Sequence, residues 1–264
     1  MHRKVFKTKK GERHSIEFEK YNYNNVLSPN INRKQILSEE MDSILKDCWG
    51  LFPSDFIEKH IFDEKCRIII AKHSNEFIGF CVLSLRNISE VNVHYVEFLA
   101  IKRNFQNFGL GPYLFYLIIY EDIKRNFLKL LFEPIEIMFI TPNTRALMRM
   151  AKFASFIYPN PYLADNNGTI PQADDLTWKM AQGLIDSSDK PDRKLYREGL
   201  VLEGSYAETP WLIYGPENAP WVKNPKIIGF VKKYMGYHNK EDKELIVRAQ
   251  ITLGSVFKYL FFNK

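Results

Sequence analysis

The stretch EFLAIKRNFQNFGLGPYLFYLII, residues 97–119, decides the fold because it joins a strand, a glycine-containing loop and a helix. Residues 98–101 are apolar and end a strand pattern, whereas Pro112 suits the first turn of a helix, where its missing N–H costs little. Between them lies QNFGLG, residues 106–111, which we call the cradle loop. Its glycines allow close backbone approach, and the first N–H groups of a helix lack internal partners. This order of strand, glycine-containing loop and helix predicts an anion-binding site at the loop.

A pyrophosphate is the natural ligand of such a loop, and the alternative is a tight strand-to-helix turn that binds nothing. A Rossmann nucleotide site is disfavoured because Leu114 stands where the third glycine of G-x-G-x-x-G belongs. A Walker loop is absent, since no Gly-Lys-Ser or Gly-Lys-Thr follows the glycines.

The elements around this stretch predict an α/β fold, with a mixed α+β sheet. Strand patterns cover residues 67–73, 77–85 and 93–101, with a hairpin at 74–76, and a helix runs from Pro112 to Arg125. A strand over 134–141 and a helix opened by Asn143 follow. A hairpin feeding a strand, helix and strand implies a central sheet that is antiparallel first and parallel later, flanked by helices. Upstream, Ser38 reads as the N-cap of a helix.

Composition changes after Phe156, because eight of the 13 prolines and three of the four tryptophans (Trp178, Trp211 and Trp221) lie between there and Pro225. We therefore expect a basic N-terminal tail over 1–14, a core over 15–156 and a C-terminal helical and loop extension over 157–264. Within the extension, apolar spacing predicts helices over 174–186 and 241–260. The second helix suits a homodimer interface as well as a core.

The charge of +6 is concentrated at the N-terminus, since residues 1–14 hold six Lys and Arg against one Glu. A folded surface that binds nucleic acid gathers such charge on its body, so nucleic acid is an unlikely partner. We expect residues 1–13 to be dispensable for ligand binding.

A hydrophobic content of 45% supports a full core and excludes the disordered class. The three cysteines, Cys48, Cys66 and Cys81, have no CxxC spacing, which predicts neither disulfides nor a metal site. No secretory pattern follows the basic N-terminus and no apolar run reaches the roughly 20 residues of a membrane span. We expect a cytoplasmic protein without metal or membrane association.

The combination of Q-x-x-G-x-G after the strand 98–101, an apolar helix, a strand and Asn143-Thr-Arg-Ala146 resembles the GNAT superfamily of acetyl-CoA-dependent N-acetyltransferases. The resemblance covers roughly residues 67–156. It implies that the cradle loop amides hold the coenzyme A pyrophosphate, that the strand lies beside the pantetheine, and that the Asn contacts the cofactor. The implied cofactor residues are Phe98, Leu99, Ala100, Ile101, Gln106, Asn107, Phe108, Gly109, Leu110, Gly111 and Asn143.

Two positions depart from the family pattern. Met150 stands where the family often places a Tyr that protonates the departing thiolate, and Pro112 removes an amide from the cradle. Tyr158, which follows the same predicted helix, is the candidate acid. Tyr113 and Tyr116 are alternatives for the acid, although packing is the better explanation of each of these tyrosines.

Glu97 is the candidate base, because amide formation needs a neutral amine and this carboxylate lies on an otherwise apolar strand. Desolvation there is expected to raise its pKa. The alternative is that Glu97 faces solvent or pairs with a basic side chain. His94 and Tyr95 are further candidates for base or relay.

The resemblance implies direct transfer of acetyl from acetyl-CoA to a primary amine, without a covalent intermediate. Its alternatives are a non-catalytic acyl-CoA-binding or interaction module and an acyltransferase for longer chains. The acceptor is not specified, since one scaffold serves many amines. The Trp-rich extension could wall the acceptor site, or form an accessory core.

Overall fold

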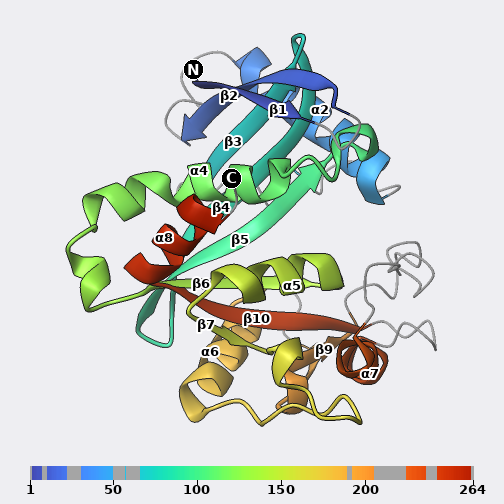
Figure 1. The fold of residues 1–264 in the computed structure, drawn as a ribbon, viewed down its shortest axis with the longest axis vertical. Coiled ribbons are helices and arrows are strands. Elements are labelled where there is room, and N and C mark those ends of the chain that lie inside the picture. Colours follow the sequence, from blue (N-terminus) through green and yellow to red (C-terminus); the bar gives the residue numbers. More distant parts are fainter. Residues whose placement is uncertain are drawn as a thin grey trace. The chain divides into compact units, whose positions relative to one another are not determined.

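A computed structural model describes residues 2–7, 11–22, 31–49, 57, 66–188, 192–204, 224–235 and 243–262. The chain divides into two compact units (Figure 1). Unit 1 comprises residues 1–86 and 95–127, and unit 2 comprises 87–94 and 128–264, so the expected core over 15–156 contributes to both. Strands and helices are mixed along the chain, which confirms the predicted α/β class.

Unit 1 is built on the strand order β1-β2-β3-β4-β5. The strands are β1 (His2–Lys7), β2 (Arg13–Asn22), β3 (Cys66–His73), β4 (Glu76–Ile88) and β5 (Val91–Ile101). The predicted hairpin between β3 and β4 is present, with Ser74 and Asn75 at φ 50° and 68° in its turn. The turn between β4 and β5 belongs to unit 2, where Ser89 Oγ donates to the carbonyl of Lys179 at 3.1 Å.

Helices cover both faces of the unit 1 sheet. On one face, α2 (Ile31–Trp49) packs on Ile68 and Ile70 through the buried side chains Leu37, Met41, Ile44, Leu45 and Cys48. Successive side chains of a strand point to opposite faces, so Arg67 of β3 points away from α2. On that opposite face, Arg67 forms an ion pair with Asp122 of α4 (Leu110–Arg125).

The prediction that Ser38 caps a helix is wrong. The helix begins at Ile31 and continues through Ser38, because burial of Leu37 on the same face as Met41 extends the packed stripe upstream of the serine. The predicted strands over 67–73, 77–85 and 93–101 correspond to β3, β4 and β5, and the predicted helix from Pro112 to Arg125 corresponds to α4.

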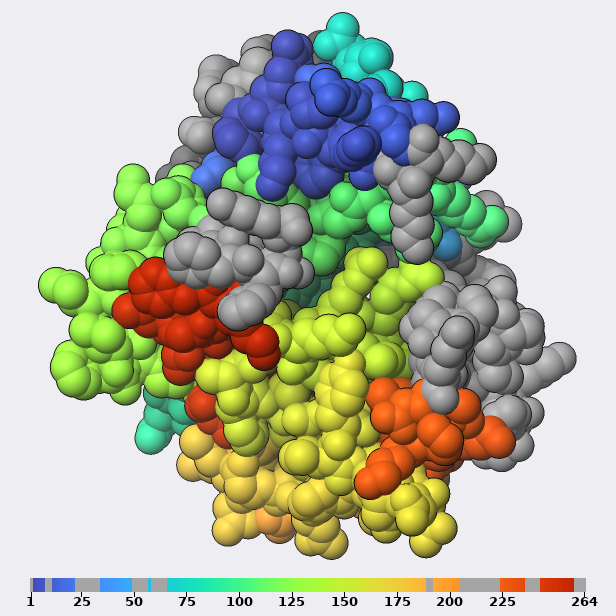
Figure 2. All heavy atoms as spheres, viewed as in Figure 1, coloured from blue at the N-terminus to red at the C-terminus, as the bar shows by residue number. Residues whose placement is uncertain are grey.

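The N-terminal segment differs from the expected tail. Residues 2–7 form β1, which pairs antiparallel with β2 in a register that sets Phe6 opposite His14. Phe6 is buried against Phe18 and Tyr113, whereas the other side chains of β1 are exposed. Figure 2 shows this hairpin, in blue, at the surface of unit 1. The apolar signal of β1 rests on Phe6 alone, too little to register as an alternating pattern.

Unit 2 has the strand order β6-β10-β9-β8, with β7 also paired to β10. Its strands are β6 (Ile135–Thr141), β7 (Phe156–Tyr158), β8 (Lys194–Tyr196), β9 (Val201–Glu203) and β10 (Lys243–Ile251). Its helices are α5 (Thr144–Phe153), α6 (Asp175–Asp186), α7 (Pro225–Tyr234) and α8 (Leu253–Phe262). The predicted helix over 174–186 is α6, and Asp174 caps it by accepting from the Thr177 N–H at 2.7 Å.

The predicted helix over 241–260 is wrong, because 243–251 form β10 and the helix α8 starts only at Leu253. The run Leu245, Ile246 and Val247 is buried at every position, which is the pattern of a strand covered on both faces. Buried Arg248 of β10 donates from Nε and Nη2 to Glu136 on β6 at 3.0 and 2.9 Å, which compensates its charge inside unit 2.

Over the described ranges, no helix combines the length and the apolar composition that a membrane crossing requires. The cysteines Cys48, Cys66 and Cys81 are free thiols, and all three are buried.

Candidate functional site

The cradle loop connects β5 to α4 within unit 1. After β5 the chain makes a 3₁₀ turn, η1 (Arg103–Phe105), and then two residues of the loop, Asn107 and Gly109, adopt φ values of 70° and 80°. Gly109 is the N-cap of α4 in the left-handed conformation that glycine adopts without steric cost. This backbone path explains why a glycine suits position 109.

The N-terminus of α4 presents backbone donors to the loop. The Tyr113 N–H already donates to the Gly109 carbonyl at 3.3 Å, and Pro112 has no N–H. The N–H groups of Leu110 and Gly111 therefore form the donor pair of the first turn, at the positive end of a 16-residue helix. A Cβ built on Gly109 meets no atom within 4 Å, so there is open space at the loop. The cradle loop thus fits the pyrophosphate of a coenzyme.

Two side chains hold the end of β5 beneath this loop. The Ile101 carbonyl accepts from Gln106 Nε2 at 3.0 Å and from Cys48 Sγ at 2.7 Å. Gln106, predicted to bind the cofactor, thus turns its amide back onto the strand and anchors the loop. Burial raises the pKa of the Cys48 thiol to about 12, so the cysteine is a protonated hydrogen-bond donor at neutral pH.

The predicted strand residues divide between two faces of β5. Phe98 and Ala100 are buried in the core beneath α2, whereas Leu99 and Ile101 are half-buried on the opposite face. The Lys102 N–H donates to the Ile78 carbonyl at 2.8 Å, so pairing with β4 continues to the start of the loop. The side chains available to a ligand at this strand are those of Leu99 and Ile101.

Glu97 has charged and polar partners, which corrects the expectation of a carboxylate surrounded only by apolar groups. Its Oε1 accepts from Arg86 Nη2 at 2.6 Å and from Ser84 Oγ at 2.5 Å. The guanidinium of Arg86 also lies 4.1 Å from the centre of the Tyr95 ring. The alternative reading from the sequence, pairing with a basic side chain, is the one found. Periodicity could not reveal Arg86, because β4 supplies it from across the hairpin.

Tyr158, the candidate acid, ends β7 in unit 2. Its hydroxyl accepts from the Gly199 N–H at 3.2 Å, and the side chain is buried. Burial raises the pKa of Tyr158 to about 12. These surroundings suit a buried hydrogen-bond acceptor that holds the residues around Gly199.

Asn143 is the N-cap of α5 in unit 2. Its Oδ1 accepts from the N–H groups of Arg145 and Ala146 at 2.9 and 3.4 Å, which is the side-chain geometry of a helix cap. The carboxamide oxygen therefore serves the helix, and the amide nitrogen is the group left to meet a ligand. Met150, at the position of the family tyrosine, lies on the same helix.

Of the alternative candidates, Tyr113 and Tyr116 take packing roles and His94 belongs to unit 2. Tyr113 packs against His2, Phe6 and Phe18, and burial raises its pKa. Tyr116 lies beside Tyr113 and Tyr120, and burial raises its pKa too. His94 is half-buried in the segment of β5 that belongs to unit 2.

The predicted tryptophan wall is described only in part. Trp178 lies on α6, with the Arg197 guanidinium 6.0 Å from its ring centre. Trp211 and Trp221 lie outside the described residues.

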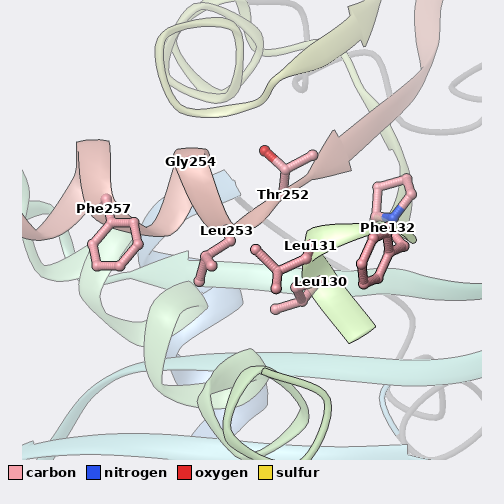
Figure 3. Close-up of a pocket in the computed structure, with 8 residues that line it drawn as sticks. Leu130, Leu131, Phe132, Thr252, Leu253, Gly254 and Phe257 are labelled. Carbon is pink, nitrogen blue, oxygen red and sulfur yellow. The ribbon is translucent and has the colours of Figure 1, made fainter. Parts of the chain in front are cut away.

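Unit 2 contains an apolar pocket of about 370 Å³ between the segment 130–134 and the start of α8 (Figure 3). Its lining residues are Leu130, Leu131, Phe132, Pro134, Thr252, Leu253, Gly254 and Phe257. None of them is a predicted site residue, and the lining offers neither an acid nor a base. In the part of the chain that the structure describes, no group of three or more His, Cys, Asp or Glu side chains could hold a metal ion.

Sequence reasoning missed one cluster beside the cradle loop, formed by His14, His73, Phe105 and Phe108. The His14 ring stacks on Phe108, with ring centres 5.4 Å apart and planes 11° apart. The two histidines belong to β2 and β3, far from the loop in sequence, so no local pattern could have linked them to it.

Residues 35–133 match the model of the acetyltransferase (GNAT) family. No curated protein matches the sequence. The ribosomal-protein-S18-alanine N-acetyltransferase of Escherichia coli is similar at 11% identity and a TM-score of 0.39, over 54% of this chain and 81% of that one. Tetrahymena GCN5 is similar at 16% identity and a TM-score of 0.38, over 54% and 79%.

A glucosamine N-acetyltransferase region of a fungal multi-domain β-N-acetylglucosaminidase is similar at 15% identity and a TM-score of 0.34, over 48% of this chain. The match spans 13% of that fungal protein.

Proposed function

We propose that this protein transfers an acetyl group from acetyl-CoA to a primary amine, because residues 35–133 match the model of the acetyltransferase (GNAT) family. The observation that carries the proposal is the cradle loop, with left-handed Gly109 and open space in front of it at the N-terminus of a 16-residue helix. Such a loop suits a pyrophosphate.

The coenzyme-binding residues follow from the unit 1 geometry. The N–H groups of Leu110 and Gly111 are assigned to the pyrophosphate, and the half-buried face of β5 at Leu99 and Ile101 to the pantetheine arm. When bound, acetyl-CoA supplies a thioester whose carbonyl carbon is open to attack by an amine. The unit 2 residue Asn143 stays a proposed contact through its amide nitrogen.

Glu97 is the proposed acceptor of the amine's proton. The attacking amine must be neutral, and most primary amines are protonated at neutral pH, so a carboxylate that takes up the proton favours the reaction. Arg86 Nη2 and Ser84 Oγ both donate to Glu97 Oε1, so the carboxylate is held in one orientation on β5.

The role of Tyr158 as the acid that protonates the departing thiolate stays a prediction. Its hydroxyl already accepts from Gly199, and a pKa of about 12 makes it a weak proton donor at neutral pH. Water is the proton donor that requires no rearrangement of the buried side chain.

A thiol-release assay tests the proposed function. The protein is incubated with acetyl-CoA and a panel of amines comprising peptide N-termini, lysine side chains, polyamines and aminoglycosides, and free coenzyme A is quantified. We expect release that depends on one class of amine. Binding of acetyl-CoA without release in any arm would favour a non-catalytic module, and faster release from longer acyl-CoAs would favour a different acyl donor.

A further inference from the structure

Four aromatic rings meet on one side of the cradle loop in unit 1. His14 at the start of β2 stacks on Phe108 of the loop, and it meets Phe105 of η1 edge-on, with ring centres 5.9 Å apart and planes at 75°. His73 at the end of β3 also packs on Phe105, at 5.4 Å between ring centres. Two strands that are distant in sequence therefore contact the loop through histidine side chains.

The two histidines contact each other as well. His14 Nδ1 and His73 Nε2 are 3.4 Å apart, a hydrogen bond in which one nitrogen must be an unprotonated acceptor. Glu12 Oε2 lies 3.9 Å from His14 Nε2, and Glu76, which stands opposite His73 in the β3–β4 pairing, is bound to Lys102 at 2.7 Å. The hydrogen bond between the two rings therefore fixes how each imidazole is oriented beside the cradle loop.

We propose that His14 is a positioning residue for coenzyme binding. Its hydrogen bond to His73 orients the imidazole, and the imidazole holds Phe108 so that the cradle loop keeps the conformation in which Leu110 and Gly111 present their N–H groups. This inference rests on the proposed function. Without the stack, the loop becomes ordered only when the coenzyme binds. The entropy lost in ordering the loop then opposes binding and weakens the affinity for the coenzyme.

Two substitutions at position 14 separate the effect of the stacked ring from that of the hydrogen bond to His73. His14→Ala removes the ring and is expected to weaken the binding of CoA roughly threefold to tenfold at pH 8, the equivalent of one aromatic pair. His14→Phe restores a ring against Phe108 and is expected to recover most of the affinity. In turnover assays, His14→Ala raises the KM for acetyl-CoA and leaves kcat nearly unchanged, because the reacting groups are untouched.

A double-mutant cycle with Phe108→Ala identifies the partner of His14. If the two rings act through their mutual contact, the double variant binds CoA about as weakly as either single variant. Additive losses would show that His14 affects the coenzyme by some other route. Amide hydrogen exchange of residues 106–111 in the free protein gives a second readout, and we expect faster exchange in His14→Ala than in His14→Phe.

Calorimetric titration of the full-length wild type, His14→Ala and His14→Phe with CoA at pH 8 is the closing experiment. Weaker binding by His14→Ala together with rescue by His14→Phe supports the inference. Equal affinities for all three proteins overturn it and leave the proposed function standing. No binding of CoA by the wild type overturns the proposed function, and with it any coenzyme role for His14.

Discussion

Arg86 Nη2 donates to Glu97 Oε1 at 2.6 Å, on the strand that leads into the cradle loop. The Glu97 side chain is 7% exposed and that of Arg86 is 33% exposed, so the carboxylate is shielded from water while its partner reaches the surface. The contact holds the carboxylate in one orientation on β5. Two substitutions measure its contribution.

Glu97→Gln keeps the shape of the side chain and removes its ability to accept a proton. If Glu97 is the base, turnover falls by about 10² to 10⁴ while acetyl-CoA binding persists. Activity should recover partly at high pH, where free amine accumulates. Steady-state kinetics across pH check this, and near-normal turnover with an unchanged acidic limb would make Glu97 a structural partner of Arg86.

Arg86→Met removes the guanidinium beside Glu97 and leaves the hydrogen bond from Ser84 in place. If Arg86 holds the carboxylate in its working orientation, turnover should fall by about tenfold or more while acetyl-CoA binding persists. Arg86→Lys is the matched control, because it keeps a positively charged donor. Unchanged turnover in Arg86→Met would show that this contact does not position Glu97 for the reaction.

Phe6 and Val5 are neighbours on β1 that face opposite sides, and they test whether the N-terminal segment belongs to the fold. Phe6 is 7% exposed beside Phe18 and Tyr113, whereas Val5 is 57% exposed. Phe6→Ala should lower the free energy of unfolding by about 2 to 4 kcal/mol, and Val5→Ala by less than about 0.5 kcal/mol. Urea denaturation measures both changes. Small effects of equal size would indicate that residues 1–14 are a tail that does not pack on unit 1.

Tyr158→Phe separates the structural and acid roles of this hydroxyl. The folded pKa of about 12 exceeds the unfolded value of about 10, so the protonated folded state is favoured below pH 10 and stability declines as the pH rises from 10 to 12. The variant should lose that component of the alkaline decline. It should also lose about 1 to 2 kcal/mol at neutral pH, because the Gly199 N–H loses its acceptor.

The turnover of Tyr158→Phe decides its catalytic role. We expect near-normal turnover from the buried position of the hydroxyl. A decrease of about 10² or more, with the protein still folded, would identify Tyr158 as the acid that the sequence suggested.

Local patterns predicted the strands and α-helices from β3 to α5. The hairpin at Ser74, the helix after the cradle loop and the Asn143 cap each depend on a few adjacent residues, and all three are present. The prediction failed at residues 243–251, where the spacing of Leu245 and Ala249 suits a helix but the full burial of the run requires a strand. Burial on both faces depends on which segments pack alongside, and the spacing of residues does not record it.

The candidate site was predictable only where it is continuous in sequence. The glycines of the cradle loop predict an anion site, because the argument needs only these glycines and the helix that follows them directly in the sequence. The partners that shape the site come from elsewhere in the chain, and they include Arg86 beside Glu97, Cys48 beneath Ile101 and His14 on Phe108. Each of these contacts depends on the pairing of strands or on helix docking, which no stretch of sequence specifies by itself.

Gly109 offers the most direct measurement of the central claim, that the cradle loop holds the coenzyme. Asn and Asp both tolerate the left-handed conformation at 109 and nothing lies within 4 Å of the added Cβ, so the two variants differ mainly in one negative charge. A carboxylate near the pyrophosphate should weaken binding by roughly 1 to 4 kcal/mol.

The measurement is the binding of acetyl-CoA to the wild type, Gly109→Asn and Gly109→Asp by calorimetric titration, with thermal shift as a second readout. At about 100 times its dissociation constant, acetyl-CoA should stabilise the wild type by roughly 2.7 kcal/mol. We predict that Gly109→Asn binds and that Gly109→Asp binds at least about tenfold more weakly than Gly109→Asn. Equal binding by the Asp and Asn variants, with both folded, would contradict the assignment of the cradle loop as the coenzyme site.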